Sequence, residues 1–398
     1  MRRTLAIAIA VVAVVPVARA DAPPLATRLA QALAVPGNAA TASSAVAVDL
    51  TTGSVLFARN ADLPLAPASN EKLTVTYAAL RELGAAYRFH TEVFARGTLD
   101  GDTWHGDIFL KGFGDPTLTS LQLDSLAAQI AELGIVRIDG RVLADETWFD
   151  TRRTASGWKA SFYVNECPPL SALVADRAWY DHHTASQPAL AAAGLLRALL
   201  RAHGIAAGAV GSGRAPESAL ELAEVESAPL TNVLAKMDRE SDNFIAEMLL
   251  KELGAEAGTA GTTAAGAAVV RRDLAADGIP LAGVRIVDGS GLSLDDRLTA
   301  HALSALLLSA WNDAGLHATL WSALPVAGAT GTLEDRMQRR PARGAVHAKT
   351  GTTDRASALS GYVRDRYAFA VMQNGRPVAT VAARKAQDRF ATALASAP

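Results

Sequence analysis

The sequence predicts an α+β fold in which an antiparallel sheet is built from both ends of the chain and helices fill the middle. Residues 45–58 alternate apolar and polar side chains around a Thr51-Thr52-Gly53 turn, which predicts a β-hairpin. Near the other end, Leu359 to Val363 and Tyr367 to Met372 predict two strands joined by a short turn. Strands at both ends with helices between them favour one sheet flanked by helices.

Helical periodicity is expected in five stretches, each with apolar residues three or four positions apart. The first begins at Ser69, directly after Pro64 and Pro67 break the chain, and continues to about Gly84. The other four stretches cover residues 229–254, 262–277, 299–313 and 378–396.

The stretch from about 88 to 215 has a different character. Five glycines between Gly97 and Gly114 separate short apolar runs such as Ile108-Phe109-Leu110. Glycines at this frequency break helices and suit short strands joined by turns. We therefore expect an inserted β-rich domain over 88–215, and a larger domain formed by 21–87 together with 216–398.

The composition indicates a folded protein whose main partner is not nucleic acid. Half of the 398 residues are apolar and a fifth are charged, so the chain can bury a large core. A net charge of −2 argues against nucleic acid as the main partner. Cys167 is the only cysteine, so no internal disulfide is expected and folding depends on core packing.

The first twenty residues have the pattern of a secretion signal. Arg2 and Arg3 precede an unbroken apolar run from Leu5 to Val15, and Ala18-Arg19-Ala20 forms a cleavage site. This apolar run is too short for a membrane-spanning helix, which needs about 20 apolar residues. We predict that 1–20 is a cleavable signal peptide and that the mature chain, without a transmembrane anchor, is periplasmic or alternatively secreted.

The first chemical motif is Ser69-Asn70-Glu71-Lys72, at the start of the first predicted helix. Lys72 lies three residues after Ser69, one turn along the same helix face, so a lysine amine can reach the seryl oxygen. A helix start also points free N–H groups toward that oxygen. When this motif is taken alone, a capping serine followed by a solvated lysine is the better explanation. A second S-x-x-K, Ser156 to Lys159, lies in a loop-like setting and is rejected.

The second motif is Ser241-Asp242-Asn243, the only S-x-N in the sequence. In an extended segment, side chains two residues apart point the same way, so Ser241 and Asn243 can face one cleft. The alternative is that Ser241 or Asp242 only caps the helix that follows.

The third motif is Lys349-Thr350-Gly351, followed by Thr352. On a strand, Lys349 and Gly351 share one face, and a glycine lets a ligand approach the backbone closely. The alternative is a simple turn, since Thr353 and Asp354 follow. Each motif is modest alone, but the ordered triple supplies a serine nucleophile, a lysine base, a second hydroxyl and a cation.

This ordered triple is the pattern of the penicillin-recognising serine enzymes. The chain resembles the D-alanyl-D-alanine carboxypeptidase/endopeptidase family of low-molecular-mass penicillin-binding proteins, which carry an inserted domain between the first two motifs. The similarity covers nearly the whole mature chain and includes further stretches: Gly112-Phe113-Gly114-Asp115-Pro116, Asp288-Gly289-Ser290-Gly291-Leu292-Ser293 and Leu324-Pro325-Val326-Ala327-Gly328. The resemblance implies a β-lactamase/transpeptidase-like catalytic domain with the inserted β-rich domain.

The same resemblance implies a serine D-Ala-D-Ala carboxypeptidase, with DD-endopeptidase action as a further activity and no metal or cofactor. Its substrates would be peptidoglycan stem peptides ending in D-Ala-D-Ala, and β-lactam antibiotics would acylate it. Ser69 would attack the carbonyl between the two D-alanines, and neutral Lys72 would take its proton. Ser241 would relay the proton to the leaving amine, and Asn243 would hold the substrate amide and Lys72.

For the third motif, the resemblance implies a substrate-binding strand. Lys349 would bind the terminal carboxylate of the substrate together with the hydroxyls of Thr350 and Thr352, beside Gly351. As a second cation across the site, Lys349 would also lower the pKa of Lys72, as would partial desolvation. The backbone N–H groups of Ser69 and Thr352 would stabilise the oxyanion.

Two other functions stay open at this point. A serine β-lactamase has the same three motifs but needs a base for deacylation. Glu166 lies in the required interval, although Cys167-Pro168-Pro169 beside it does not resemble the loop of those enzymes. A non-catalytic peptidoglycan-binding protein with the same fold is the second alternative.

Overall fold

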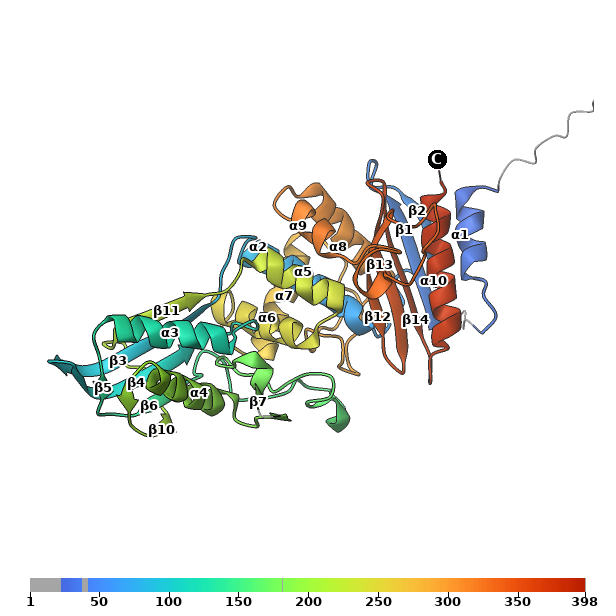
Figure 1. Ribbon diagram of the computed structural model, residues 1–398. Helices are drawn as coiled ribbons and strands as arrows, with labels where there is room; N and C mark the ends of the chain where they lie inside the picture. Colours follow the sequence, from blue (N-terminus) through green and yellow to red (C-terminus); the bar gives the residue numbers. More distant parts are fainter. Residues whose placement is uncertain (1–22, 38–41, 181, 398) are drawn as a thin grey trace, which may run out of the picture.

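Two separate sheets lie toward opposite ends of an elongated molecule (Figure 1). The computed structural model describes residues 23–37, 42–180 and 182–397. The predicted signal peptide, 1–20, lies outside these described residues. Within the described part of the chain, no helix combines the length and apolar character that a membrane crossing requires.

The first sheet has five antiparallel strands in the order β12-β13-β14-β1-β2, so both ends of the chain form it as predicted. In sequence order its strands are β1 Ser43–Asp49, β2 Val55–Arg59, β12 Val346–Thr352, β13 Ala356–Val363 and β14 Tyr367–Asn374. β1 pairs with β14 along its whole length, with Val46 opposite Ala370. β12 lies at one edge of the sheet, and this edge position later matters for the site.

Helices cover both faces of this sheet, and alternate residues of β1 enter different cores. Ala45 and Ala47 pack with α1 and α10 on one face, whereas Val46 and Val48 join the larger core on the other face. This alternation follows from the two-residue period of a strand. The helices of this part of the chain are α1 Leu25–Leu33, α2 Lys72–Glu82, α5 Leu230–Glu240, α6 Asn243–Glu256, α7 Thr263–Ala276, α8 Ala300–Asn312, α9 His317–Ala323 and α10 Thr380–Ala395.

The helical stretch predicted over 229–254 is two helices rather than one. α5 ends at Glu240, and Ser241 adopts a left-handed conformation with φ of 61°. Asp242 then caps α6 by accepting a hydrogen bond from the Ile245 N–H at 3.0 Å. Apolar periodicity is compatible with both helices, so it could not reveal the break between them.

The second sheet is formed by the middle of the chain. Its main path runs β10-β6-β4-β3-β11, and β5 pairs with β4 and β9. The bounds are β3 His90–Asp100, β4 Thr103–Gly112, β5 Arg137–Ile138, β6 Val142–Asp145, β9 Ala206–Ala207, β10 Val210–Ser212 and β11 Leu220–Glu226, and a small separate hairpin is formed by β7 Trp179–Tyr180 and β8 His183–Thr184. β11 pairs with β3, so this sheet extends past residue 215, where we expected the inserted region to end.

Two helices, α3 Ser120–Glu132 and α4 Pro188–Ala202, pack against this second sheet, and the sequence analysis missed both. The frequent glycines in and beside β3 and β4 led to a prediction of strands and turns for the whole middle region. The helix signals were nevertheless present, because Thr119 and Gln122 form a capping box and Pro188 opens α4. The middle region therefore contains a sheet with helices rather than strands and turns alone.

Candidate functional site

Ser69 and Lys72 lie at the junction between a 3₁₀ turn, Ala68–Glu71, and α2. The Lys72 Nζ donates to the Ser69 Oγ at 3.1 Å, as the three-residue spacing predicts. Lys72 is fully buried, whereas Ser69 is partly exposed. The seryl oxygen therefore faces an open cleft while the amine beside it is shielded from water.

The break between α5 and α6 brings the second motif to the same cleft. The Asn243 Oδ1 accepts a hydrogen bond from Lys72 Nζ at 2.8 Å. The Asn243 amide nitrogen donates to the backbone carbonyl of Glu166 at 3.0 Å. Asp242 caps α6, as one interpretation of this motif predicted. Asn243 contacts Lys72, as the other interpretation predicted, so both hold, each for a different residue.

Edge strand β12 carries the third motif into the cleft. The Lys349 Nζ donates to the Ser241 Oγ at 2.8 Å and to the Thr350 carbonyl at 3.0 Å. The Asn70 side chain, which the sequence analysis passed over, donates to the Lys349 carbonyl at 3.0 Å. This bond fixes β12 against the turn that carries Ser69.

Gly351 allows a close contact between two backbone segments. A Cβ at this position would lie 2.9 Å from the Pro67 carbonyl oxygen and 3.0 Å from the Ser69 nitrogen. The missing side chain thus lets β12 approach the backbone of the nucleophile segment itself. The close approach of a ligand to Gly351 stays a prediction.

The two threonines beside Gly351 have partners that the sequence did not indicate. The Thr350 hydroxyl donates to the Thr332 hydroxyl at 2.7 Å. The exposed Thr352 hydroxyl accepts from the Arg384 guanidinium, on α10, at 3.3 Å. The hydroxyls of Thr350 and Thr352 and the guanidinium of Arg384 therefore follow Lys349 along one edge of the cleft.

A loop over residues 288–293 completes the surroundings of Lys72. The Ser290 carbonyl accepts from Lys72 Nζ at 2.8 Å, so the amine has three oxygen partners. The Glu247 Oε1 accepts from the N–H groups of Gly289 and Ser290 at 3.0 and 2.8 Å, which orients that carbonyl. The resemblance to the family included this loop, but the sequence could not show that the Ser290 carbonyl contacts Lys72.

Burial sets the electrostatics of the two lysines. It lowers the pKa of Lys72 to about 8, against the opposing effect of nearby carboxylates that include Asp288. Burial also lowers the pKa of Lys349 to about 7, with the charge of Lys72 as the second cause. We expected Lys349 and partial desolvation to lower the pKa of Lys72, and desolvation is the main cause. A neutral amine is thus accessible near neutral pH.

A group of buried carboxyl groups lies behind Lys72. Burial raises the pKa of Glu71 and Asp296 well above their usual range, in each case with Asp288 as the next cause. The same two causes raise the pKa of Glu247 to about 8, so this carboxyl is protonated at neutral pH.

The protonated state of Glu247 predicts a pH-dependent stability. The folded-state pKa is raised, so the stabilisation is fully present below the unfolded pKa of about 4.5 and is lost as pH rises toward 8. Each proton retained only by the folded state changes the free energy of unfolding by about 1.4 kcal/mol per pH unit. We expect Glu247→Gln, which mimics the protonated form, to give a flatter stability profile between pH 5 and 8 in urea unfolding.

The exposed Glu256→Gln is the matched control and should keep the wild-type slope. If Glu247→Gln also kept that slope, the carboxyl would not hold its proton in the folded protein.

Other candidate residues do not join this site. Lys159 of the second S-x-x-K is paired with Asp354 at 2.7 Å instead of with its serine. Cys167 is buried in an apolar cluster, and burial raises the pKa of its thiol, so it is not an activated nucleophile. Among the described residues, the one group with metal-ligand geometry is His90, Glu224 and Glu226, on the second sheet and partly exposed.

Comparisons with known proteins point to one family. The profile of the D-Ala-D-Ala carboxypeptidase 3 (S13) family matches residues 25–187 and 181–397. A D-alanyl-D-alanine carboxypeptidase of Actinomadura sp. is 33% identical, over 84% of this chain and 78% of its own length. A carboxypeptidase of Mycobacterium tuberculosis is also 33% identical, over 96% of this chain and 86% of its own. The crystal structure of penicillin-binding protein 4 from Haemophilus influenzae has the same fold, with a TM-score of 0.80 and 22% identity over 93% of this chain and 98% of that one.

Proposed function

The chain belongs to the D-Ala-D-Ala carboxypeptidase 3 (S13) family, and from this premise we propose that it is a serine D-Ala-D-Ala carboxypeptidase acting through an acyl-enzyme on Ser69. One observation carries the proposal. A partly exposed serine is hydrogen-bonded to a buried lysine whose pKa is lowered to about 8, which is the activated-nucleophile arrangement. The substrates are peptidoglycan stem peptides that end in D-Ala-D-Ala.

In the acylation step, the Ser69 Oγ attacks the carbonyl carbon between the two D-alanines. Neutral Lys72 takes the seryl proton, and the Asn243 and Ser290 oxygens then stabilise the ammonium that forms. The peptide C–N bond breaks as Lys72 passes its proton through the Ser241 hydroxyl to the leaving D-Ala nitrogen, which makes Lys72 neutral again. This transfer leaves an ester on Ser69 and free D-Ala.

The edge of the cleft that carries Lys349 and Arg384 would bind the terminal carboxylate of the substrate. Lys349, with the hydroxyls of Thr350 and Thr352, would hold the terminal carboxylate, and Arg384 adds a second cation beside Thr352. The backbone N–H groups of Ser69 and Thr352 would receive the oxyanion. Losing one such donor typically costs about 10²–10³ in kcat.

In the second step, water attacks the ester carbonyl and Lys72 takes a proton from the water. The ester bond breaks and Ser69 recovers its proton. The same chemistry on a cross-linking D-Ala amide would be DD-endopeptidase action, and a β-lactam ring would acylate Ser69 in the same way. For location, residues 1–20 support export of the chain to the periplasm or beyond it.

The serine β-lactamase alternative depends on Glu166. Its backbone carbonyl contacts Asn243, which places this segment at the cleft, but its side chain is exposed. The family membership favours the peptidase, in which the penicilloyl ester is long-lived.

The deciding experiment offers the mature protein a stem pentapeptide, cross-linked muropeptides and, separately, benzylpenicillin. We expect mass spectrometry to find released D-Ala from the pentapeptide and a stable penicilloyl adduct on Ser69. Cleavage of the cross-linked substrate would establish the endopeptidase activity. Rapid penicillin hydrolysis without D-Ala release would instead identify a β-lactamase. No reaction with the peptides or with penicillin would favour a non-catalytic peptidoglycan-binding protein.

A further inference from the structure

The segment from Gly157 to Glu166, in the middle region of the chain, contacts two elements of the catalytic cleft. The Glu166 carbonyl accepts a hydrogen bond from the Asn243 side chain at 3.0 Å. The Gly157 carbonyl accepts one from the backbone of the loop over 288–296 at 3.2 Å. Both elements also supply oxygen partners of Lys72, so this segment adjoins the catalytic base at two places.

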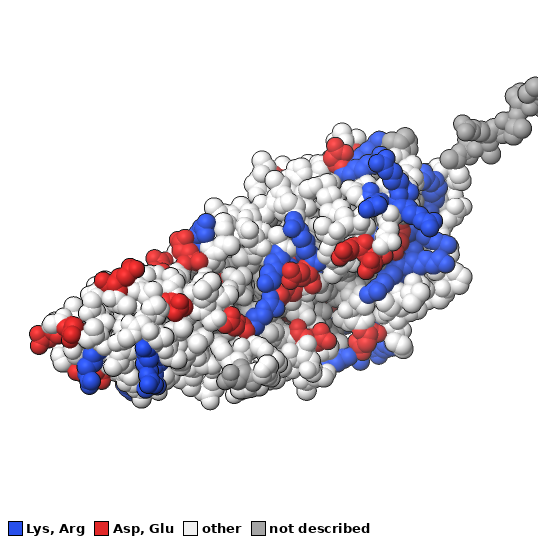
Figure 2. All heavy atoms as spheres, viewed as in Figure 1, with Lys and Arg blue, Asp and Glu red and all other residues white. Residues whose placement is uncertain are grey.

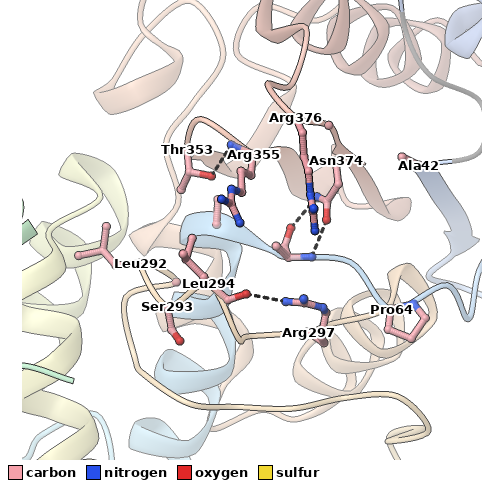
Figure 3. Close-up of a pocket in the computed structure, with 14 residues that line it drawn as sticks. Ala42, Pro64, Leu292, Ser293, Leu294, Arg297, Thr353, Arg355, Asn374 and Arg376 are labelled. Atoms are coloured by element: carbon pink, nitrogen blue, oxygen red, sulfur yellow. Dashed lines mark hydrogen bonds between the residues drawn. The ribbon is translucent and has the colours of Figure 1, made fainter. Parts of the chain in front are cut away.

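The contact between this segment and the loop is close. Gly157 has a φ of +77°, and a Cβ at this position would lie 2.3 Å from the Ser293 hydroxyl oxygen. Further along, the loop is fixed by Arg297, whose guanidinium donates to the Leu294 carbonyl at 3.0 Å (Figure 3). The loop is therefore held both by its own residues and by the middle region.

Trp158 makes a polar contact between the two parts of the chain. Its indole Nε1–H donates to the Oδ2 of Asp288 at 2.8 Å, and Asp288 is fully buried. The N–H groups of Gly291 and Ser293 donate to the same carboxyl group, each at 2.7 Å, and the Ser290 hydroxyl donates at 3.3 Å. Within the described chain, these other donors all belong to the loop itself. A buried carboxylate needs such donors to keep its charge, and the indole supplies the one from outside the loop.

Asp288 connects this indole to the catalytic base. Its bonds fix the turn from which the Ser290 carbonyl accepts a hydrogen bond from Lys72 Nζ, at 2.8 Å. Its charge also acts on Lys72 directly. Burial lowers the pKa of Lys72 to about 8, and the charge of Asp288 is the largest effect in the opposite direction. Trp158 therefore influences the base both through the position of the loop and through the charge of Asp288.

Other titratable groups also surround Lys72 and Asp288 and share their environment. They are Glu71 on the turn before α2, Asp238 on α5, Asp242 at the start of α6, Glu247 within α6, Asp296 on the loop, Cys167 in the middle region and Lys349 on β12. Within the described chain, the Trp158 indole forms no hydrogen bond with any of these groups. Removing the indole N–H therefore affects this environment through Asp288.

We propose that Trp158 is a positioning residue for the acylation step, which acts on Lys72 through Asp288 and the loop that carries Ser290. This inference rests on the proposed function, because Lys72 is the base of that mechanism. The second S-x-x-K, rejected as a catalytic motif, contributes instead through the tryptophan within it. The middle region thus completes the surroundings of the catalytic base.

The test compares acylation by benzylpenicillin in the wild type and in Trp158→Phe. Phenylalanine keeps a ring in the apolar cluster that includes Leu292, but it lacks the N–H. We expect the maximal acylation rate to fall about tenfold, as is typical when a hydrogen bond to a charged group is lost. The acid-side midpoint of the pH profile should also move to lower pH, because Asp288 then stabilises the Lys72 ammonium less. We expect a shift of about 0.5–1 unit, a part of the roughly 1–3 units that a nearby opposite charge supplies.

Trp148→Phe is the matched control, because Trp148 is also a partly buried residue of the middle region that donates its indole N–H to a buried carboxyl group. The acceptor is the Oε2 of Glu252, on α6, at 3.0 Å. Glu252 also accepts a hydrogen bond from Tyr87 at 2.6 Å and, in the described chain, forms none with the loop over 288–296. This variant should lower stability and keep the wild-type acylation rate and pH profile.

Lys159→Met tests whether any contact between the two parts of the chain has the same effect. Lys159 follows Trp158 and forms an ion pair with the exposed Asp354 at 2.7 Å. Figure 2 shows Lys and Arg side chains beside Asp and Glu side chains over the middle of the molecule, so surface charges of both signs are common there. A solvent-exposed pair contributes little, and we expect the acid-side midpoint to stay in place.

Two results would overturn the proposal directly. One is a wild-type rate, or a lower rate with an unchanged pH profile, in Trp158→Phe; the other is an equal effect of Trp148→Phe. If Trp158→Phe does not fold, Asp288→Asn replaces it, since loss of this charge should also move the acid-side midpoint to lower pH. When both fold, adding Trp158→Phe to Asp288→Asn should move the midpoint no further, and an additional shift would contradict action through Asp288.

Direct titration of Lys72 separates this proposal from the proposed function. The chain has seven lysines, so NMR of protein with ¹³C-labelled lysine resolves them, and Lys72→Arg identifies the Lys72 signal. The pKa of Lys72 should be lower in Trp158→Phe than in the wild type and unchanged in Trp148→Phe. This measurement requires no turnover, so a failure of the carboxypeptidase assignment would be seen in the activity assays alone.

Discussion

Replacing Ser69 with alanine is expected to abolish both the penicilloyl adduct and D-Ala release. The side chain that forms the ester is removed, while the partners of Lys72 on Asn243 and Ser290 remain in place. Loss of a nucleophile in a serine enzyme lowers kcat by about 10⁴-fold or more. The measurements are D-Ala release from a pentapeptide and intact-protein mass after incubation with benzylpenicillin.

Ser156→Ala is the matched control, since Ser156 begins the second S-x-x-K and its lysine is paired with Asp354. It should keep wild-type activity. If Ser69→Ala released D-Ala as fast as the wild type, the assignment of the nucleophile would be wrong.

The second large effect concerns Lys72 and its protonation. Lys72→Arg keeps a positive charge but cannot act as a base near neutral pH, so we expect acylation to fall by about 10²–10⁴-fold. The adjacent Lys349 titrates in the same range, with pKa lowered to about 7 against about 8 for Lys72. The reactive form of the pair carries one proton, with Lys72 neutral and Lys349 charged. Because the pKa of Lys72 is the higher of the two, this is the less populated of the two one-proton forms.

A pair that must hold a single proton gives a bell-shaped pH profile. Acylation by penicillin should be fastest between about pH 7 and 8 and should fall toward tenfold per unit at more acidic and more alkaline pH. The acid limb reflects gain of a second proton by the pair, and the alkaline limb reflects loss of its last proton. Stopped-flow acylation rates across pH 5–10 measure both limbs.

Lys251→Met is the matched control, because Lys251 is also fully buried but is paired with Asp150 outside the cleft. It should lower stability and leave the pH profile unchanged. A flat wild-type profile across this range would contradict the assignment of Lys72 as the base.

Local patterns in the sequence were enough to predict much of the fold. The alternation over 45–58 and the C-terminal strands correctly placed one sheet at both ends of the chain, since period-two patterning depends only on neighbouring residues. The same reasoning missed α3 and α4, because frequent glycines nearby outweighed the capping signals. It also joined α5 and α6, since a single left-handed residue leaves the apolar period intact.

By itself, the sequence determined the order of the candidate reactive groups: Ser69 with Lys72, then Ser241 with Asn243, then Lys349 on a strand. Only the Ser69–Lys72 contact follows from local geometry, because one helical turn joins them. The tertiary structure alone decided that Lys72 also contacts Ser290, 218 residues away in the chain, and that Gly351 makes room for the nucleophile backbone. Burial, which lowers the pKa of both lysines, likewise depends on how distant segments pack, and no spacing rule encodes that.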